Sequence, residues 1–165
     1  MLLFLDIDGV MVPAKSWLKP ELLNDGFSAF SSKAIAALQS IISEGTTIVL
    51  TTSHKKNYTL HQWKQIFKTR GIDVAKIQTL KANTNNLNRK DEITRWFYKK
   101  NLNDSFVILD DDKSLNDLPE HLKSHLVLTN PIVGLTQDQV EEIRKILRKS
   151  YSQPRIALKK TKAHL

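Results

Sequence analysis

The sequence of 165 residues contains no cysteine and no long hydrophobic run, and it has only five glycines and five prolines. Without cysteine the chain can form neither a disulfide nor a thiolate zinc site. The apolar run at residues 1–5 is far too short for a signal peptide or a membrane span, so we expect a cytoplasmic protein with no membrane partner. The apolar fraction of 41% is ordinary for a globular protein, and the length suits one domain.

Positive charge is abundant, but its excess is confined to one end of the chain. Residues 143–165 hold eight Lys and Arg residues and no acid, and subtracting these eight from 25 leaves 17 bases against 17 acids in residues 1–142. We therefore divide the chain into a domain over residues 1–150 and a basic tail over residues 151–165. The tail is either a surface that meets a polyanion such as nucleic acid or a solubilising segment, and the sequence leaves both open.

Two apolar runs end abruptly in carboxylates. Leu2–Leu5 leads into Asp6 and Asp8, and Phe106–Leu109 leads into three aspartates at positions 110–112. Four consecutive apolar residues are typical of a strand buried on both faces of a parallel sheet, and ligands bind beyond the carboxyl ends of such strands. If the two strands are neighbours, each close carboxylate pair costs ~4 kcal/mol at an effective dielectric constant near 20. The pattern therefore predicts a site for a divalent cation, which would relieve this repulsion.

Apolar periodicity predicts strands that alternate with helices. The expected strands cover residues 2–5, 46–50, 76–80, 106–109 and 125–128. The expected helices cover residues 33–43, 58–70, 91–100 and 136–149. This alternation predicts an α/β fold in three layers, with a doubly wound and mostly parallel sheet.

Four short motifs resemble those of the haloacid dehalogenase (HAD) superfamily of aspartate-nucleophile phosphatases. They are the DxDG sequence at residues 6–9, an apolar strand ending in Thr at residues 48–52, Lys90 near a helix start, and paired acids at 110–111. All four occur in the order that the family has, which makes the signal much stronger than DxDG alone. The resemblance implies a Rossmann-like core whose first strand is central, between the second and fourth strands.

The resemblance also implies catalytic roles. Asp6 would be the nucleophile of phosphoryl transfer and would form an aspartyl-phosphate, and Asp8 would be the general acid and base. Thr52 would donate a hydrogen bond to the phosphoryl oxygens, and Lys90 would neutralise them. Relatives that pump ions carry Thr in place of the second aspartate, so Asp8 favours a phosphatase.

By the same resemblance, Mg²⁺ is the expected cofactor. Its ligands would be a side-chain oxygen of Asp6, the main-chain carbonyl of Asp8 and the side chain of Asp111. Asp110 or Asp112 would act directly or through water.

Several assignments stay open at this level. Thr51 could replace Thr52, because a shift of one residue decides which side chain faces the site. Lys81 could replace Lys90. The family often has a further acid four residues after the paired acids, but Leu115 occupies that position, so Asp112 or Asp117 would have to compensate. The expected substrate-binding residues are Gly9, Thr51, Ser53 and His54.

The spacing of the motifs leaves no room for a cap domain. Asp6 and Thr52 are 46 positions apart and Thr52 and Lys90 are 38 apart, and the predicted helices and strands use both intervals. An open site favours a large phosphorylated substrate such as a nucleic-acid end, as in capless relatives associated with RNA repair. The alternatives are a small metabolite in a site capped by oligomerisation, a phosphoacceptor module without turnover, and a nucleic-acid-binding module on the same fold. The oligomeric state is left open.

Overall fold

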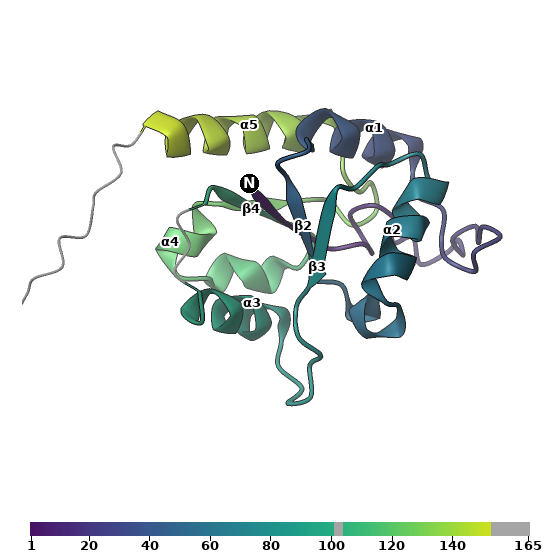
Figure 1. The fold of residues 1–165 in the computed structure, drawn as a ribbon, viewed down its shortest axis with the longest axis horizontal. Helices are drawn as coiled ribbons and strands as arrows, with labels where there is room; N and C mark the ends of the chain where they lie inside the picture. The colour runs from purple at the N-terminus through teal and green to yellow at the C-terminus, as the bar shows by residue number, and fades with distance from the viewer. Residues whose placement is uncertain (101–103, 153–165) are drawn as a thin grey trace, which may run out of the picture.

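The computed structural model describes residues 1–100 and 104–152, which form a five-stranded sheet between two layers of helices (Figure 1). The strands are β1 (Leu2–Leu5), β2 (Thr47–Leu50), β3 (Lys76–Thr79), β4 (Phe106–Asp110) and β5 (Leu126–Leu128). Their order is β3-β2-β1-β4-β5, and every neighbouring pair is parallel. The predicted α/β fold with a central first strand is therefore confirmed.

Five α-helices and two 3₁₀ helices connect the strands. They are α1 (Ser32–Ile41), η1 (Ser53–Asn57), α2 (Leu60–Thr69), α3 (Arg89–Tyr98), η2 (Lys113–Asp117), α4 (Glu120–Lys123) and α5 (Gln137–Ser152). The four long helices match the predicted ones to within a few residues. The short helices η1, η2 and α4 were not predicted, because one turn is too short to show a helical period. Helix α5 includes the first two residues of the expected tail, and residues 153–165 lie outside the described part of the chain.

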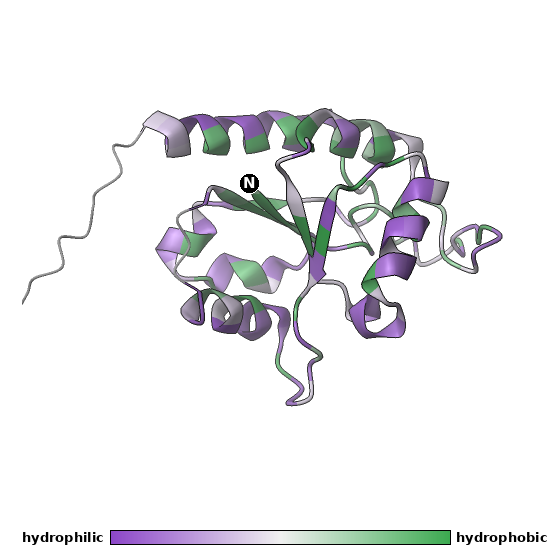
Figure 2. Cartoon of the chain, viewed as in Figure 1, coloured by the Kyte–Doolittle hydropathy of each residue, from purple (hydrophilic) through white to green (hydrophobic). Residues whose placement is uncertain are grey.

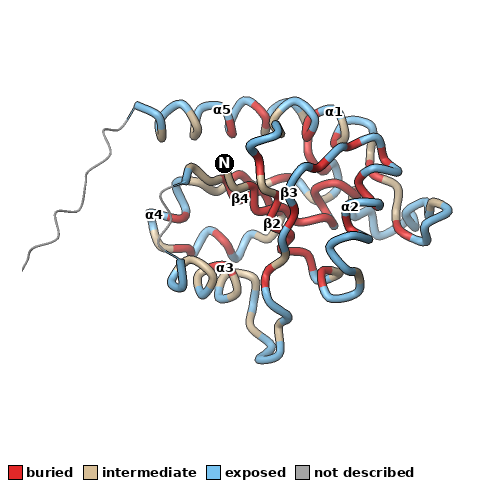
Figure 3. The backbone as a smooth tube through the Cα atoms, viewed as in Figure 1, coloured by how far each residue is buried: buried red, intermediate tan, exposed pale blue. Residues whose placement is uncertain are grey.

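The two faces of the sheet bury two separate clusters of side chains. Leu3 and Leu5 of β1 point to the cluster formed with α1, α2 and α5, whereas Phe4 points to the cluster formed with α3, η2 and α4. This alternation is the two-residue period of a strand. Figure 2 shows apolar strands at the centre with polar helix surfaces outside, and Figure 3 shows most of the buried backbone in these central strands.

No second domain is inserted between the strands of the described residues, so the site at the strand ends has no cap domain. In the loop after β1, one isolated antiparallel bridge joins Leu22 and Ser28. Arg70 fastens this loop by donating hydrogen bonds to Asp25 (2.6 Å) and to the carbonyls of Phe27 and Ser28 (2.9 Å each). Among the described helices, none is both long enough and apolar enough to span a membrane.

Candidate active site

Three polar side chains extend one face of the sheet at its carboxyl edge. The parallel register pairs Leu5 of β1 with Leu50 of β2 and with Leu109 of β4, so the next residues, Asp6, Thr51 and Asp110, lie side by side. The strand hydrogen bonds continue to this level, from Asp6 N to Leu109 O (3.1 Å) and from Thr51 N to Leu5 O (3.0 Å). The two-residue period directs all three side chains toward the face that α3 covers.

The predicted carboxylate cluster forms at this edge. Asp6, Asp110 and Asp111 each offer an oxygen, and these oxygens all lie within 4.8 Å of one another. Asp110 is completely buried, and its Oδ1 accepts hydrogen bonds from the main-chain N–H groups of Asp111 (2.9 Å) and Asp112 (3.0 Å). These two bonds fix the Asp110 carboxylate and the turn that aims Asp111 at Asp6.

The cation that contacts the cluster is Arg89. Its Nη1 lies 2.6 Å from Asp110 Oδ2 and 3.3 Å from Asp6 Oδ1, and it also donates a hydrogen bond to Thr51 Oγ1 (3.0 Å). Only 14% of the Arg89 side chain is exposed, and its Nε is buried without a hydrogen-bond partner. Three carboxylates against one guanidinium leave the ionised cluster with a net charge of −2.

Burial and mutual repulsion raise the pKa of each carboxyl group in the cluster. Burial raises the pKa of Asp6 to about 6, although the charge of Arg89 opposes the rise. Burial and then the charge of Asp6 raise the pKa of Asp110 to about 6, again against Arg89. Burial and the charge of Asp110 also raise the pKa of Asp111. The protein thus holds these charges together at a cost that one arginine does not fully offset.

Asp8 stands apart from the cluster, on the solvent side. Its side chain is 55% exposed, and its Oδ2 lies 2.8 Å from Nε2 of His54. The His54 ring packs edge-on against Phe27, with 5.5 Å between the ring centroids. Because Arg70 holds the loop that carries Phe27, a chain of contacts runs from α2 through Phe27 and His54 to Asp8. The structure therefore gives His54 a contact with Asp8, a partner that the sequence did not suggest.

Gly9 makes the close approach of Asp111 possible. It has φ +78°, and a Cβ at this position would lie 2.2 Å from Asp111 Oδ2 and 2.5 Å from its Cγ. The Gly9 carbonyl accepts a hydrogen bond from the Thr129 hydroxyl (2.7 Å), which ties this turn to the segment after β5. Any side chain at position 9 would displace the Asp111 carboxylate from the cluster.

The two threonines after β2 face different partners. Thr51 lies within 3.5 Å of Asp110 Oδ2 and contacts Arg89, whereas the Thr52 hydroxyl accepts a hydrogen bond from His54 N (3.3 Å) and caps η1. Both threonines are buried, and Ser53 is exposed at the first position of η1. Thr51 is therefore the threonine that the structure brings to the carboxylate cluster.

The two lysines proposed for the site make no ion pair. Lys90 is half-buried and Lys81 is exposed, and neither comes within 4.0 Å of a carboxylate in the described ranges 1–100 and 104–152. The reason is that α3 begins at Arg89, capped by the Asn88 side chain, two residues before the predicted start. One residue is a rotation of about 100° on a helix, which turns Lys90 away from the direction of Arg89. The sequence signal for Arg89 was the Asn cap that precedes it.

The acids that follow Asp111 serve the local chain. Asp112 Oδ1 accepts a hydrogen bond from Ser114 N (2.9 Å) and caps η2, and Asp117 is exposed at the end of that helix. Leu115 occupies the position where the family often has a further acid, and it is fully buried in the hydrophobic cluster under α3. Within the described residues, the acidic groups that could share a metal are thus Asp6, Asp110 and Asp111.

A buried ion pair that was not predicted from the sequence adjoins the site. Lys55 of η1 lies 2.8 Å from Glu92 of α3, and only 6% and 11% of the two side chains are exposed. This is an ion-pair distance without hydrogen-bond geometry, since Glu92 Oε2 has no hydrogen-bond partner. The pair fixes η1, and with it the segment from Thr51 to His54, against the helix that carries Arg89.

The donor set of the cluster suits a magnesium ion. Carboxylate oxygens are the ligands that Mg²⁺ prefers, and the ionised group carries a net negative charge after Arg89 is counted. Asp111 is the most exposed of the three carboxylates, whereas Asp6 and Asp110 are buried and contact Arg89. The residues present therefore fit the cation that the sequence motifs imply.

Comparison with known proteins identifies one family. The family model described as "HAD domain in Swiss Army Knife RNA repair proteins" matches residues 2–140. No curated protein and no solved structure matches the chain. The matched range contains every residue of the carboxylate cluster, together with Arg89, Asp8 and His54.

Proposed function

The chain belongs to the HAD domains of Swiss Army Knife RNA repair proteins, a family whose fold implies phosphoryl-transfer chemistry, and we propose that it is a magnesium-dependent phosphatase acting on phosphorylated nucleic-acid ends. The observation that carries this proposal is the group at the strand ends. Asp6 lies next to a guanidinium, a threonine hydroxyl and two further aspartates, and Asp8 lies on the open side.

In the first step, an Asp6 oxygen attacks the phosphorus atom. The bond from phosphorus to the leaving oxygen breaks, and that oxygen takes its electron pair and a proton from Asp8. Arg89 favours the ionised form of Asp6, which the attack requires. Arg89 and Thr51 lie on the buried side of Asp6, and the exposed position of Asp8 leaves it accessible to a leaving group that arrives from solvent.

In the second step, Asp8 takes a proton from a water molecule whose oxygen attacks the same phosphorus atom. The bond between phosphorus and the Asp6 oxygen breaks, phosphate leaves, and the Asp6 carboxylate is regenerated. His54 holds Asp8 through the 2.8 Å contact and so orients it for both proton transfers. We assign His54 as a positioning residue for Asp8.

Asp6, Asp111 and the main-chain carbonyl of Asp8 would hold the Mg²⁺ ion, with Asp110 behind them. When bound, the ion would supply positive charge that offsets the clustered carboxylates and the phosphoryl oxygens.

The absence of a cap within the described residues supports a large substrate. An open strand-end site cannot enclose a small metabolite without help, whereas it can admit a polymer end. Eight basic residues in residues 143–165 offer a further surface for a polyanion. The second candidate substrate is a small metabolite in a site that oligomerisation encloses. The open site is the one observation that supports it.

The first experiment tests the chemistry. Purified protein with Mg²⁺ should hydrolyse an aryl phosphate, and Asp6→Asn should abolish hydrolysis while retaining its melting transition. Asp104→Asn, which changes an aspartate outside the cluster, is the matched control and should keep its activity. Stoichiometric labelling without turnover would indicate a phosphoacceptor module, and more than a few per cent residual activity in Asp6→Asn would exclude Asp6 as the nucleophile.

The second experiment tests the substrate. Hydrolysis of 5′- and 3′-phosphorylated oligonucleotides is compared with that of sugar phosphates, for the full chain and for a chain ending at Ser152. The proposal expects oligonucleotides to be the better substrates and truncation to weaken their use most at low salt. Preference for sugar phosphates would support the small-metabolite alternative, and equal oligonucleotide turnover by both chains at all salt concentrations would remove the tail as a substrate surface.

A further inference from the structure

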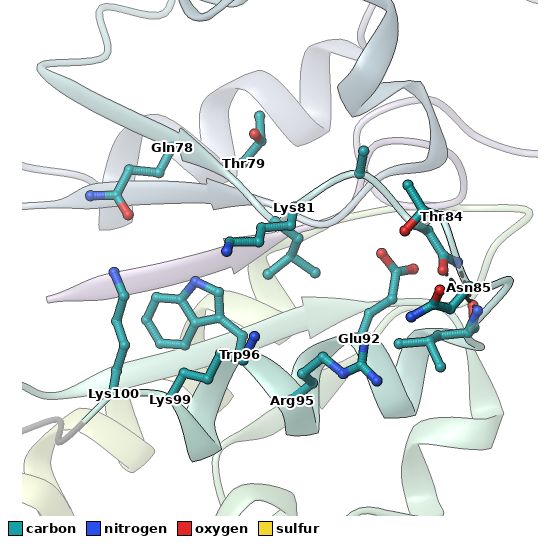
Figure 4. A pocket seen from close by; sticks show the side chains of 14 residues that line it. Gln78, Thr79, Lys81, Thr84, Asn85, Glu92, Arg95, Trp96, Lys99 and Lys100 are labelled. Atoms are coloured by element: carbon teal, nitrogen blue, oxygen red, sulfur yellow. Dashed lines mark hydrogen bonds between the residues drawn. The ribbon is translucent and has the colours of Figure 1, made fainter.

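A cavity extends along β3 and α3, from the carboxyl edge of the sheet that carries the candidate active site toward the C-terminal end of α3 (Figure 4). Its volume is about 430 Å³, and it lies between the end of β3, the loop after it and the face of α3 that carries Glu92 and Trp96. Leu80 N donates to Leu50 O (3.0 Å), so the loop starts next to the end of β2. The carboxyl-edge end of the cavity is thus two strand spacings, roughly 10 Å, from the end of β1 and Asp6. Trp96, Lys99 and Lys100 line the other end of the cavity, at the C-terminal end of α3.

The loop after β3 forms one wall of this cavity, and hydrogen bonds within the loop hold it in place. The Asn83 side chain donates to Leu87 O (2.5 Å) and accepts from Leu87 N (2.7 Å). The opposite wall is α3, the helix that also carries Arg89. A volume of 430 Å³ lies within the range of roughly 300–1,000 Å³ that is usual for small-ligand sites.

The charge of the cavity is strongly positive. Four bases line it, namely Lys81, Arg95, Lys99 and Lys100. None of them lies within 4.0 Å of a carboxylate in the part of the chain that the structure describes. The acid in the lining is Glu92, whose charge is already paired with Lys55. Four cations around one hollow favour a ligand with several negative charges.

An aromatic ring lies among these cations. Trp96 is half-buried against Phe4, with 4.8 Å between the ring centroids and an edge-on geometry, so its position is fixed by the core. Lys100 Nζ lies 4.8 Å from the centre of the indole ring. Figure 4 shows Lys81 and Lys100 beside the indole, with Glu92 farther along the cavity. An aromatic ring interleaved with cations is the usual surface for single-stranded nucleic acid, since bases stack on the ring and the cations bind phosphates.

We infer that this cavity binds one nucleotide of a single-stranded polynucleotide whose terminal phosphate reaches Asp6, an inference that rests on the proposed function and specifies its substrate. The base stacks on Trp96, and the flanking phosphates bind Lys81, Lys99 and Lys100. The cavity begins roughly 10 Å from Asp6, so at ~3.4 Å per stacked nucleotide this nucleotide lies at least about three positions from the end. The cavity therefore selects a strand end of at least this length over a small phosphate ester.

The test measures binding of a fluorescent, terminally phosphorylated hexanucleotide to the full chain. All proteins carry Asp6→Asn to prevent turnover, and 5′- and 3′-phosphorylated RNA are both used. Lys99→Gln with Lys100→Gln should raise the Kd about tenfold and lower the slope of log Kd against log salt by about 1.4, at ~0.7 per phosphate contact on a single strand. The matched control is Lys33→Gln with Lys68→Gln, which removes two exposed lysines from α1 and α2 and should change neither value.

A third variant tests the stacking. Trp96→Leu keeps an apolar side chain against Phe4 and should raise the Kd about fivefold or more, the usual effect of losing one stacked base. If this variant does not fold, the lysine variants decide alone. Equal Kd values for the Lys99/Lys100 variant and its control would overturn the inference, and so would a mononucleotide that binds as tightly as the hexamer.

Hydrolysis of an aryl phosphate by the wild type separates this inference from the proposed function. If the wild type hydrolyses the ester but the cavity variants bind the hexanucleotide with an unchanged Kd, the inference fails and the phosphatase assignment stands. If the ester is not hydrolysed but hexamer binding depends on Lys99 and Lys100, the cavity assignment stands and the phosphatase assignment fails.

Discussion

Replacing Arg89 by methionine should destabilise the metal-free protein strongly, and in a way that depends on pH. Arg89 is the cation in contact with Asp6 and Asp110, at 3.3 and 2.6 Å, and its side chain is 86% buried. Methionine preserves much of the apolar volume of the stem but removes the charge. Breaking a buried ion pair by removing one partner typically costs about 3–5 kcal/mol, a large part of the ~5–15 kcal/mol that stabilises an ordinary domain.

The pH dependence follows from the direction of the pKa shifts. The folded-state pKa values of Asp6 and Asp110 are about 6, above the ordinary value of 3.8, so the folded protein takes up protons between these limits. The contribution of these groups to stability is therefore fully present below pH 3.8 and is lost as the pH rises through about 6. Arg89 lowers the pKa values of Asp6 and Asp110. Removing Arg89 therefore raises both values further, and the loss of stability with rising pH extends above pH 6.

The assay is urea unfolding in the presence of a chelator at pH 5 and pH 8. We expect Arg89→Met to lose about 3–5 kcal/mol at pH 8 and clearly less at pH 5, where protonation replaces the missing cation. The control is Arg144→Met, whose exposed pair with Glu141 (2.8 Å) should be worth about 0.5 kcal/mol or less at either pH. Arg89→Lys, which keeps a positive charge, should recover part of the loss. Equal losses for Arg89→Met and Arg144→Met, or a loss at pH 5 as large as that at pH 8, would refute this reasoning.

Three further predictions concern the same strand ends. Millimolar Mg²⁺ should raise the melting temperature of the wild type relative to chelator, because binding relieves the carboxylate repulsion of the folded state, and identical melts with chelator-insensitive activity would exclude the metal site. Asp8→Asn should slow turnover by about 10²–10⁴-fold, whereas an unchanged pH–rate profile would remove Asp8 from proton transfer. Gly9→Ala should cost about 1–2 kcal/mol for its left-handed backbone and should also weaken Mg²⁺ affinity by displacing Asp111. The control is Gly26→Ala, with φ +77° and open space around it, which should show the backbone cost without the loss of metal affinity.

The strand ends could be found in the sequence because their signals are local. An apolar run followed by an acid marks the end of β1 and of β4, and the alternation of apolar segments predicted the fold class. The central first strand followed from the resemblance of four ordered motifs to one family. The carboxylate cluster was predicted for the same reason, since the parallel register of β1 and β4 brings the residues after each strand to one level.

The identity of the cation was decided only by the tertiary structure. Arg89 and Lys90 are adjacent in the sequence, and a helix start that differs by two residues determines which one points to Asp6. The same holds for Thr51 and Thr52, because the two-residue period of a strand sends neighbouring side chains to opposite faces. Sequence patterns locate such boundaries to within a few residues, which is coarser than the single residue on which the site depends.

The cavity beside the site was likewise beyond the reach of the sequence. Lys81 and Lys100 are nearly twenty positions apart in the sequence. The residues next to each lysine are typical of an ordinary solvent-exposed surface. They meet because β3 ends next to β2 and because α3 packs Trp96 against Phe4 of the central strand. The sequence by itself thus determined the sheet and the acids at its edge, since strand propensity and charge are properties of short segments. The packing of α3 decided which cations serve those acids, because contacts between distant segments exist only in the folded chain.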